Sequence, residues 1–284
     1  MNRLFLTIKY IVEVIKQRFY SSRFVTFIIL QFFVLYIYLA PIRNFSRDVN
    51  YPVSPWSLPF LFSNIYFQLF FVFIVIYYFS NVPFMHYSEM YQLIRTGRKK
   101  WALGKIIGII FSSFAIMLVE FFLSIIPLIG RLNFENDWGK ILYTLSITDA
   151  GSKYNILIDY NIINSYTPLK IMAIIFIIGG LLISFIGILM FSLSILSSRL
   201  VAFSITFILS IITIINSNIK FNHVWLIYLS PISWFDISNI SLKSGYNFPT
   251  FSYVIGFLTV AIIILSISII WKIKTINFQW NRED

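Results

Sequence analysis

The sequence contains no cysteine and few charged residues. Charged side chains make up 12% of its 284 residues, whereas hydrophobic side chains make up 58%. A soluble domain of this length carries roughly twice that proportion of charge. The lack of cysteine excludes disulfide bonds and thiolate chemistry, and the shortage of charge excludes an ordinary water-soluble fold. The chain is therefore predicted to be an integral membrane protein.

Motifs that mark several kinds of enzyme are also absent. Both Gly-Lys pairs, at 104–105 and 139–140, are followed by Ile rather than Ser or Thr, so the sequence has no P-loop for ATP. No His-Glu-x-x-His, paired-acid or Gly-x-Ser-x-Gly arrangement occurs. In the topology predicted below, His86 and His223 lie on opposite sides of the membrane and cannot share a metal ion. We therefore expect a non-catalytic chain that itself binds no cofactor and no metal.

Apolar segments predict the fold class. A membrane-spanning helix needs about 20 apolar residues. Six segments are long enough or nearly so: 24–41, 60–82, 103–129, 169–197, 201–217 and 250–272. The fifth is short and is followed by polar Asn-Ser-Asn, so residues 224–240 are a candidate re-entrant segment. The prediction is an all-α integral membrane protein whose transmembrane domain, residues 24–272, contains six transmembrane helices.

The distribution of basic residues predicts the orientation. With the N-terminus inside, the cytoplasmic segments are 1–23, 83–105, 198–200 and the tail 273–284, and most of the 22 basic residues lie in or directly beside them. The outside loop, 131–168, has more acidic than basic side chains. Because cytoplasmic loops are enriched in Lys and Arg, both termini are predicted to be cytoplasmic. The basic cytoplasmic loops explain the net charge of +11, so no nucleic-acid partner is expected.

The N-terminal segment, residues 1–23, is amphipathic. Lys9, Glu13 and Lys16 lie on one face of a predicted helix, and apolar residues recur at helical spacing on another. The apolar residues are Leu4, Ile8, Ile11, Ile15 and Phe19. A basic amphipathic helix of this kind lies in the membrane interface rather than across it. It serves as an anchor and topology signal, or as an elbow helix that also contacts a cytoplasmic partner.

The stretch HYSEMYQLIRTGRKKWALGKI, residues 86–106, lies between two apolar segments. Ser88 can cap a helix, Glu89 suits its first turn, and Gly97 can end it. The stretch therefore predicts a short helix at about 84–96, a turn, and the start of the third span. A loop that only fixes topology would explain the basic charges. It would not explain a separately capped helix with its own apolar face.

The same stretch resembles the first cytoplasmic loop of permease subunits of type-2 ABC exporters. The resemblance is carried by Glu89, Leu93, Arg95, Gly97, Arg98, Trp101, Leu103, Gly104 and Lys105. The family plan of an interfacial helix followed by six spans covers essentially the whole chain. It includes a proline-containing apolar segment before the last span, here YLSPISWF, 228–235. The sequence departs from the family at 95–97, where many members have a proline-containing turn.

This resemblance implies that the short helix is a coupling helix, which docks in a groove of a cytoplasmic ABC ATPase dimer. The residues implied in coupling are Tyr87, Glu89, Met90, Tyr91, Leu93, Ile94, Arg95 and Arg98. The partner ATPase would bind ATP and Mg, and a second permease chain, identical or different, would complete the complex. We expect an exporter of hydrophobic or amphipathic cargo, with a peptide favoured, surrounded by lipid in the plasma membrane of a bacterial cell.

Several polar residues fall inside the predicted spans. Glu120 is the only acid well inside one, where a carboxylate needs protein or water around it. We expect it to be protonated or to pair with Asn64 or Gln68, and either to line a pathway or to join two spans. A polar stripe follows the fifth span: Thr206, Ser210, Thr213 and Ser217. Such stripes line a wet pathway or join helices through hydrogen bonds, and Asn64 and Gln68 form a shorter one.

Two other classes of function stay open. An ion-coupled secondary transporter would be favoured by inverted repeats and several intramembrane charges, of which Glu120 is the main example. A membrane protein that senses a peptide, or gives immunity to it, without moving it is the other class. ATPase activity of the co-expressed complex, stimulated by cargo, would distinguish these classes from an exporter.

Overall fold

The computed structural model describes residues 3–82, 90–148, 151, 156, 158–219, 225–242 and 247–275. Over these ranges the chain is helical and has no strand beyond two isolated bridges, Val53 with Leu132 and Ser241 with Thr250. The helices are α1 (Arg3–Phe19), α2 (Ser22–Val49), α3 (Leu58–Leu61), α4 (Ile65–Phe79), α5 (Met90–Thr96), α6 (Arg98–Ile125), η2 (Ile126–Leu128), α7 (Gly139–Ile147), α9 (Tyr160–Ser165), α10 (Pro168–Leu196), α11 (Arg199–Ile219), α12 (Trp225–Leu229), η3 (Pro231–Phe235), η4 (Ile237–Asn239) and α13 (Phe251–Lys272).

Four helices of the described chain are long and apolar enough to cross a membrane. They are α2, α6 with its continuation η2, α10 and α13. The other two predicted spans are not among these four: α4 has 15 residues, and α11 has 21 residues, of which Arg199–Ile214 is the apolar stretch found among the described residues. A span needs about 20 residues. The long helices indicate a membrane-embedded protein, and six spans remain a prediction.

Polar residues fix the ends of several helices. The side chains of Ser21, Asn64 and Thr250 accept hydrogen bonds from the first free backbone N–H groups of α2, α4 and α13. Such caps satisfy donors that have no partner inside the helix. Asn50 ends α2 in the left-handed conformation, with φ of 51°. These polar positions, rather than apolar periodicity alone, decide where each apolar run becomes a helix.

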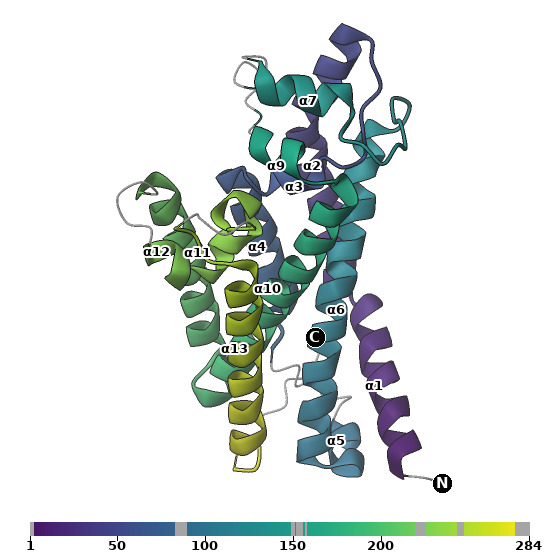
Figure 1. Ribbon diagram of the computed structural model, residues 1–284. Coiled ribbons are helices and arrows are strands. Elements are labelled where there is room, and N and C mark those ends of the chain that lie inside the picture. Colours follow the sequence, from purple (N-terminus) through teal and green to yellow (C-terminus); the bar gives the residue numbers. More distant parts are fainter. Residues whose placement is uncertain are drawn as a thin grey trace.

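Helix α10 lies at the centre of the bundle and packs mainly against α6, α13 and α11 (Figure 1). At Gly180, a Cβ atom would overlap the Phe114 ring of α6, so a glycine there allows the two helices to approach closely. The Ser184 hydroxyl donates to the Gly180 carbonyl at 2.7 Å. The close approach of α10 and α6 at this point therefore depends on the absence of a side chain at Gly180.

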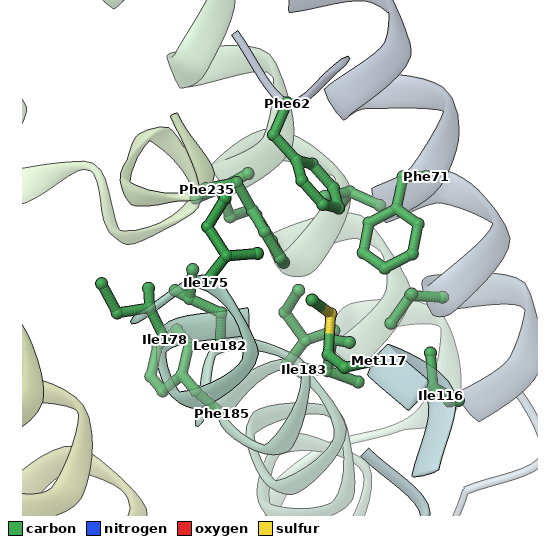
Figure 2. Packing of buried hydrophobic residues seen from close by; sticks show 14 of the residues in the cluster. Phe62, Phe71, Ile116, Met117, Ile175, Ile178, Leu182, Ile183, Phe185 and Phe235 are labelled. Carbon is green, nitrogen blue, oxygen red and sulfur yellow. The ribbon is translucent and has the colours of Figure 1, made fainter. Parts of the chain in front are cut away.

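An aromatic cluster closes the core where α4 meets η3. The rings of Phe62, Phe71 and Phe235 lie 5.2 to 5.4 Å apart between centroids. Met117 of α6 and Ile183 of α10 lie beneath them in Figure 2. The candidate re-entrant region therefore contains the short helices α12, η3 and η4, and η3 is buried in protein. Such burial is the condition under which irregular backbone is tolerated at membrane depth.

Helix α1 packs along the first turns of α6 (Figure 1). Among the described side chains of α1, which begin at Lys9, the buried ones are Tyr10, Val14 and Arg18, one helical turn apart. A Cβ atom at Gly104 would overlap the Tyr10 ring, and one at Gly108 would crowd Val14. The two glycines thus form a shallow groove on α6 that accepts α1. Of the predicted apolar face, Ile11, Ile15 and Phe19 are partly buried, and the side chains of Leu4 and Ile8 lie outside the described part.

Candidate functional site

The predicted coupling helix is present in part as α5, Met90–Thr96. Gly97 separates it from α6 with φ of +83°, a conformation that favours glycine. The Gly97 N–H donates to the Leu93 carbonyl at 2.8 Å and closes the last turn of α5. The predicted break at Gly97 is therefore confirmed. In Figure 1, α5 lies at the same end of the molecule as the start of α1.

The described side chains of α5 face in different directions. Leu93 is 9% exposed and joins the hydrophobic core, whereas Ile94 is 68% exposed and Arg95 is also exposed. Arg98 donates through Nη1 to the Lys274 carbonyl at 2.8 Å and so connects the start of α6 to the end of α13. The structure therefore leaves Ile94, not Leu93, available to a partner. Tyr87 and Glu89 lie outside the described residues, as do the side chains of Met90 and Tyr91.

Two basic side chains are buried where α1 packs against α6, Lys105 on α6 and Arg18 on α1. Lys105 is 3% exposed, and its ammonium lies 5.8 Å from the centre of the Trp101 ring. Arg18 of α1, 8% exposed, donates through Nη2 to the Lys105 carbonyl at 3.4 Å. Part of the basic block is therefore buried between α1 and α6 instead of lining a loop. Helices α1 and α5 therefore both pack against the N-terminal part of α6.

Glu120 lies inside the bundle and is fully buried. Its Oε1 accepts a hydrogen bond of 2.7 Å from Nε2 of Gln31, which is also fully buried, on α2. Glu120 Oε2 and Gln31 Oε1 have no hydrogen-bond partner within the part of the chain that the structure describes. The predicted pairing of Glu120 with Asn64 or Gln68 is wrong, because those two residues bond elsewhere. The partner, Gln31, lies on α2 instead of α4.

Asn64 and Gln68 have contacts that hold helix ends together. Asn64 Oδ1 accepts from the backbone N–H groups of Tyr66 and Phe67 at 3.0 and 3.2 Å and so caps α4. Gln68 Nε2 donates to the carbonyl of Ile232 in η3. The short polar stripe predicted on the second span is thus split between a helix cap and a contact between two elements.

The polar stripe on α11 faces protein. Thr206, Ser210 and Thr213 are each buried. Their hydroxyl groups donate to carbonyls of the same helix, those of Ala202, Thr206 and Ser210. The side chain of Ser217 lies outside the described part. Since α11 packs against α10, α4 and η3, the three described side chains allow close packing and need no hydrogen bond from another helix.

Gln31 and Asp236 are buried polar residues that sequence reasoning missed. Asp236, 4% exposed, accepts hydrogen bonds from the hydroxyls of Ser63 at 2.9 Å and Ser238 at 2.8 Å. It thereby joins the segment after η3 to the turn before α4. Gln31 could have been found, because it is the one amide in the uncharged run from 24 to 42.

Comparison with known proteins identifies no relative. No protein-family model matches the chain, and neither a curated protein nor a solved structure matches it. Among the described residues, no group of three or more His, Asp or Glu side chains lies close enough together to hold a metal ion. Any proposal of function therefore depends on the geometry of this chain and on the resemblance of the stretch 86–106.

Proposed function

We propose that the chain is the permease subunit of an ATP-binding-cassette exporter. The main supporting observation is α5, a separate short helix joined to α6 through Gly97 and presenting exposed Ile94 beside Arg95. In this proposal α4 and α11 complete six transmembrane helices, and both termini are cytoplasmic. The turns at 62–64 and 80–82 lengthen α4 at both ends.

Contacts at the N-terminal end of α6 suggest how a displacement of α5 would be transmitted to other helices. Only Gly97 lies between the two helices, so a displacement of α5 acts directly on Arg98. The bond from Arg98 to Lys274 connects that point with α13, and the bond from Arg18 to Lys105 connects it with α1. An ATPase that grips α5 would therefore move α6, α1 and α13 together. Coupled packed elements of this kind transmit a displacement better than a flexible loop does.

The proposal includes partners that this chain does not contain. A cytoplasmic ABC ATPase dimer would bind ATP and Mg, and a second permease chain, identical or different, would pair with this one. The complex would lie in the plasma membrane of a bacterial cell, surrounded by lipid. The cargo would be hydrophobic or amphipathic, with a peptide favoured, because the apolar and aromatic character of the helices suits such a molecule.

The test uses Ile94→Asp, because Ile94 is exposed and its replacement leaves the core intact. The chain is co-expressed with a candidate cytoplasmic ABC ATPase from the same organism, and co-purification and ATP hydrolysis are measured in proteoliposomes. We expect co-purification and stimulated hydrolysis to fall about tenfold, the effect of losing one interface anchor.

Leu200→Asp is the matched control, because Leu200 is 80% exposed in the first turn of α11. It should leave both measurements unchanged. Full co-purification and hydrolysis with Ile94→Asp would contradict the role of α5. A wild-type chain that binds no ATPase would overturn the exporter proposal as a whole.

An ion-coupled transporter is a second candidate, and the buried pair of Glu120 and Gln31 favours it. Intramembrane carboxyl groups with polar partners occur in proton relays of such transporters. The measurement is cargo movement in proteoliposomes driven by a pH gradient without nucleotide. Movement that requires no ATPase and disappears with Glu120→Gln would replace the exporter proposal by this one.

A further inference from the structure

Three arginines meet at the end of α2 and α6 opposite to α5. Arg43 and Arg47 belong to the last turns of α2, and Arg131 follows η2. They line a hollow of about 200 Å³. The rest of the lining is small or apolar, and among the described residues no acidic side chain contributes to it. We call this hollow the arginine pocket.

Two of the three guanidinium groups of the arginine pocket, those of Arg43 and Arg131, are held by contacts within the protein. Arg131 donates through Nη1 to the Ser46 carbonyl at 3.1 Å. The guanidinium of Arg43 lies over the ring of Tyr36, 4.4 Å from its centroid. Its Nε is buried and has no hydrogen-bond partner within the described chain. No acceptor within the described chain therefore bonds to this nitrogen, and an anion in the pocket would offset the charge of the guanidinium.

The position of the pocket along α2 indicates the kind of anion. The uncharged run 24–42 precedes Arg43 and spans roughly 30 Å as a helix, about the thickness of the hydrocarbon core. Arg43 therefore lies where hydrocarbon gives way to lipid headgroups. The stacking of its guanidinium on Tyr36, two turns back along α2, keeps the charge close to the hydrocarbon. A cation at that depth gains most from the phosphate of a lipid.

The distribution of charge supports this view. Membrane orientation explains an excess of basic residues at one end of a membrane protein only. Here one basic cluster lies at 98–105, at the end that bears α5, and the arginine pocket lies at the other. Whichever end faces the cytoplasm, the orientation bias leaves one of the two clusters unexplained. The cluster with a hollow between its side chains is the one that can take a ligand.

We propose that the arginine pocket binds a phosphate group, supplied by an anionic phospholipid or by phosphate in solution. Guanidinium groups hold phosphate through paired charge-assisted hydrogen bonds, and three of them can surround one headgroup. Ile129, which also lines the pocket and is 69% exposed, offers an apolar surface to the adjoining acyl chain. The site goes beyond the exporter proposal and does not depend on it, because a membrane-embedded chain of any function would present it.

The test measures lipid binding to the purified full chain by native mass spectrometry. The probes are phosphatidylglycerol and diacylglycerol with the same acyl chains, with inorganic phosphate as a competitor. We expect phosphatidylglycerol to bind and diacylglycerol not to bind. Arg43→Gln should weaken the binding about tenfold, the effect of one lost charge-assisted bond.

The matched control is Lys170→Gln. The Lys170 ammonium lies 4.9 Å from the centre of the Tyr166 ring, so this variant also removes a cation stacked on a tyrosine, but away from the pocket. It should bind phosphatidylglycerol like the wild type. Arg47→Gln is the second variant, because Arg47 is exposed and its replacement preserves the fold if Arg43→Gln does not.

The outcomes separate the two sources of phosphate. If inorganic phosphate binds with the same dependence on Arg43 and Arg47 while phosphatidylglycerol does not, the pocket binds soluble phosphate, and the proposed chemistry stands. Equal binding of phosphatidylglycerol and diacylglycerol would overturn the proposal. So would an equal loss of binding with Lys170→Gln, because the effect would then be one of net charge.

Discussion

Two sets of buried polar side chains lie inside the apolar helices, and they differ in how their hydrogen bonds are satisfied. On α11, the hydroxyls of Thr206, Ser210 and Thr213 donate to carbonyls of their own helix. Between α2 and α6, Gln31 and Glu120 bond to each other and leave one oxygen each without a partner among the described residues. The hydroxyls of the first set need no hydrogen-bond partner from a neighbouring helix, whereas the second set needs a polar side chain on a particular neighbouring helix.

This difference shows which buried polar residues determine the contacts between helices. A Ser or Thr in a helix can always reach the carbonyl three or four residues earlier, so a stripe of hydroxyls is compatible with plain packing. A buried carboxyl group lacks that option and needs a partner from another element or from water. The pair of Gln31 and Glu120 therefore specifies the contact of α2 with α6, while the stripe on α11 specifies no contact.

The largest effect is expected for Gln31→Leu. This change leaves Glu120 buried with no hydrogen-bond partner from α2, which should lower the free energy of unfolding by about 2 kcal/mol. The measurement is unfolding of the purified chain in mixed micelles by titration with dodecyl sulfate. An unfolding free energy equal to that of the wild type would show that the hydrogen bond adds nothing to the contact of α2 with α6.

The matched control exchanges the two residues, as Gln31→Glu combined with Glu120→Gln. An acid and an amide again face each other, so the unfolding free energy should lie within about 1 kcal/mol of the wild type. Gln31→Glu alone places two acids together and should be less stable than the exchange. If the exchange is as unstable as Gln31→Leu, the surroundings rather than the pair determine the effect.

A smaller effect is expected for Gln68→Leu. The amide of Gln68 donates to the carbonyl of Ile232, so its removal takes one hydrogen bond between α4 and η3 and should cost about 1 kcal/mol. The same titration measures the loss. A limited-proteolysis comparison should also show faster cleavage within 225–242, because this bond helps to hold η3 in place. Unchanged stability and unchanged cleavage would contradict the contact.

The smallest effect is expected for Ser210→Ala. The hydroxyl bonds to the Thr206 carbonyl, which already accepts within the helix, so the unfolding free energy should change by about 0.5 kcal/mol or less. Thr206→Val should behave in the same way. A loss as large as that of Gln31→Leu would break the comparison, because it would mean that the stripe also bonds to another helix or to water.

The sequence predicts the helical class and the break before α6, but it overestimates the second span. The apolar run 60–82 contains the end of α3, a turn and α4, and Asn64 caps α4 instead of lying within one long helix. Asn is a favoured capping residue, so this break could have been predicted. For Glu120, burial predicts that a partner is needed. It cannot predict Gln31, because apolar periodicity does not say which helices are neighbours.

The orientation of α1 shows the same limit. Its apolar spacing predicts a face that includes Ile11 and Ile15, but the face packed on α6 includes Tyr10 and Val14. The groove formed by Gly104 and Gly108 determines this choice, and that groove exists only when the two helices are side by side. Local spacing therefore predicts that α1 has an apolar side, and tertiary packing decides which side chains are buried.

The length of α6 makes it a lever arm. Glu120 lies roughly 33 Å along the helix from Arg98, at a rise of about 1.5 Å per residue. If α6 tilted by only about 5° around Gly97, Glu120 would shift by roughly 3 Å. That shift would break the hydrogen bond of 2.7 Å to Gln31. The hydrogen bond between Glu120 and Gln31 would then form or break with the tilt of α6. A spectroscopic label beside Gln31 would therefore detect a displacement of the N-terminal end of α6.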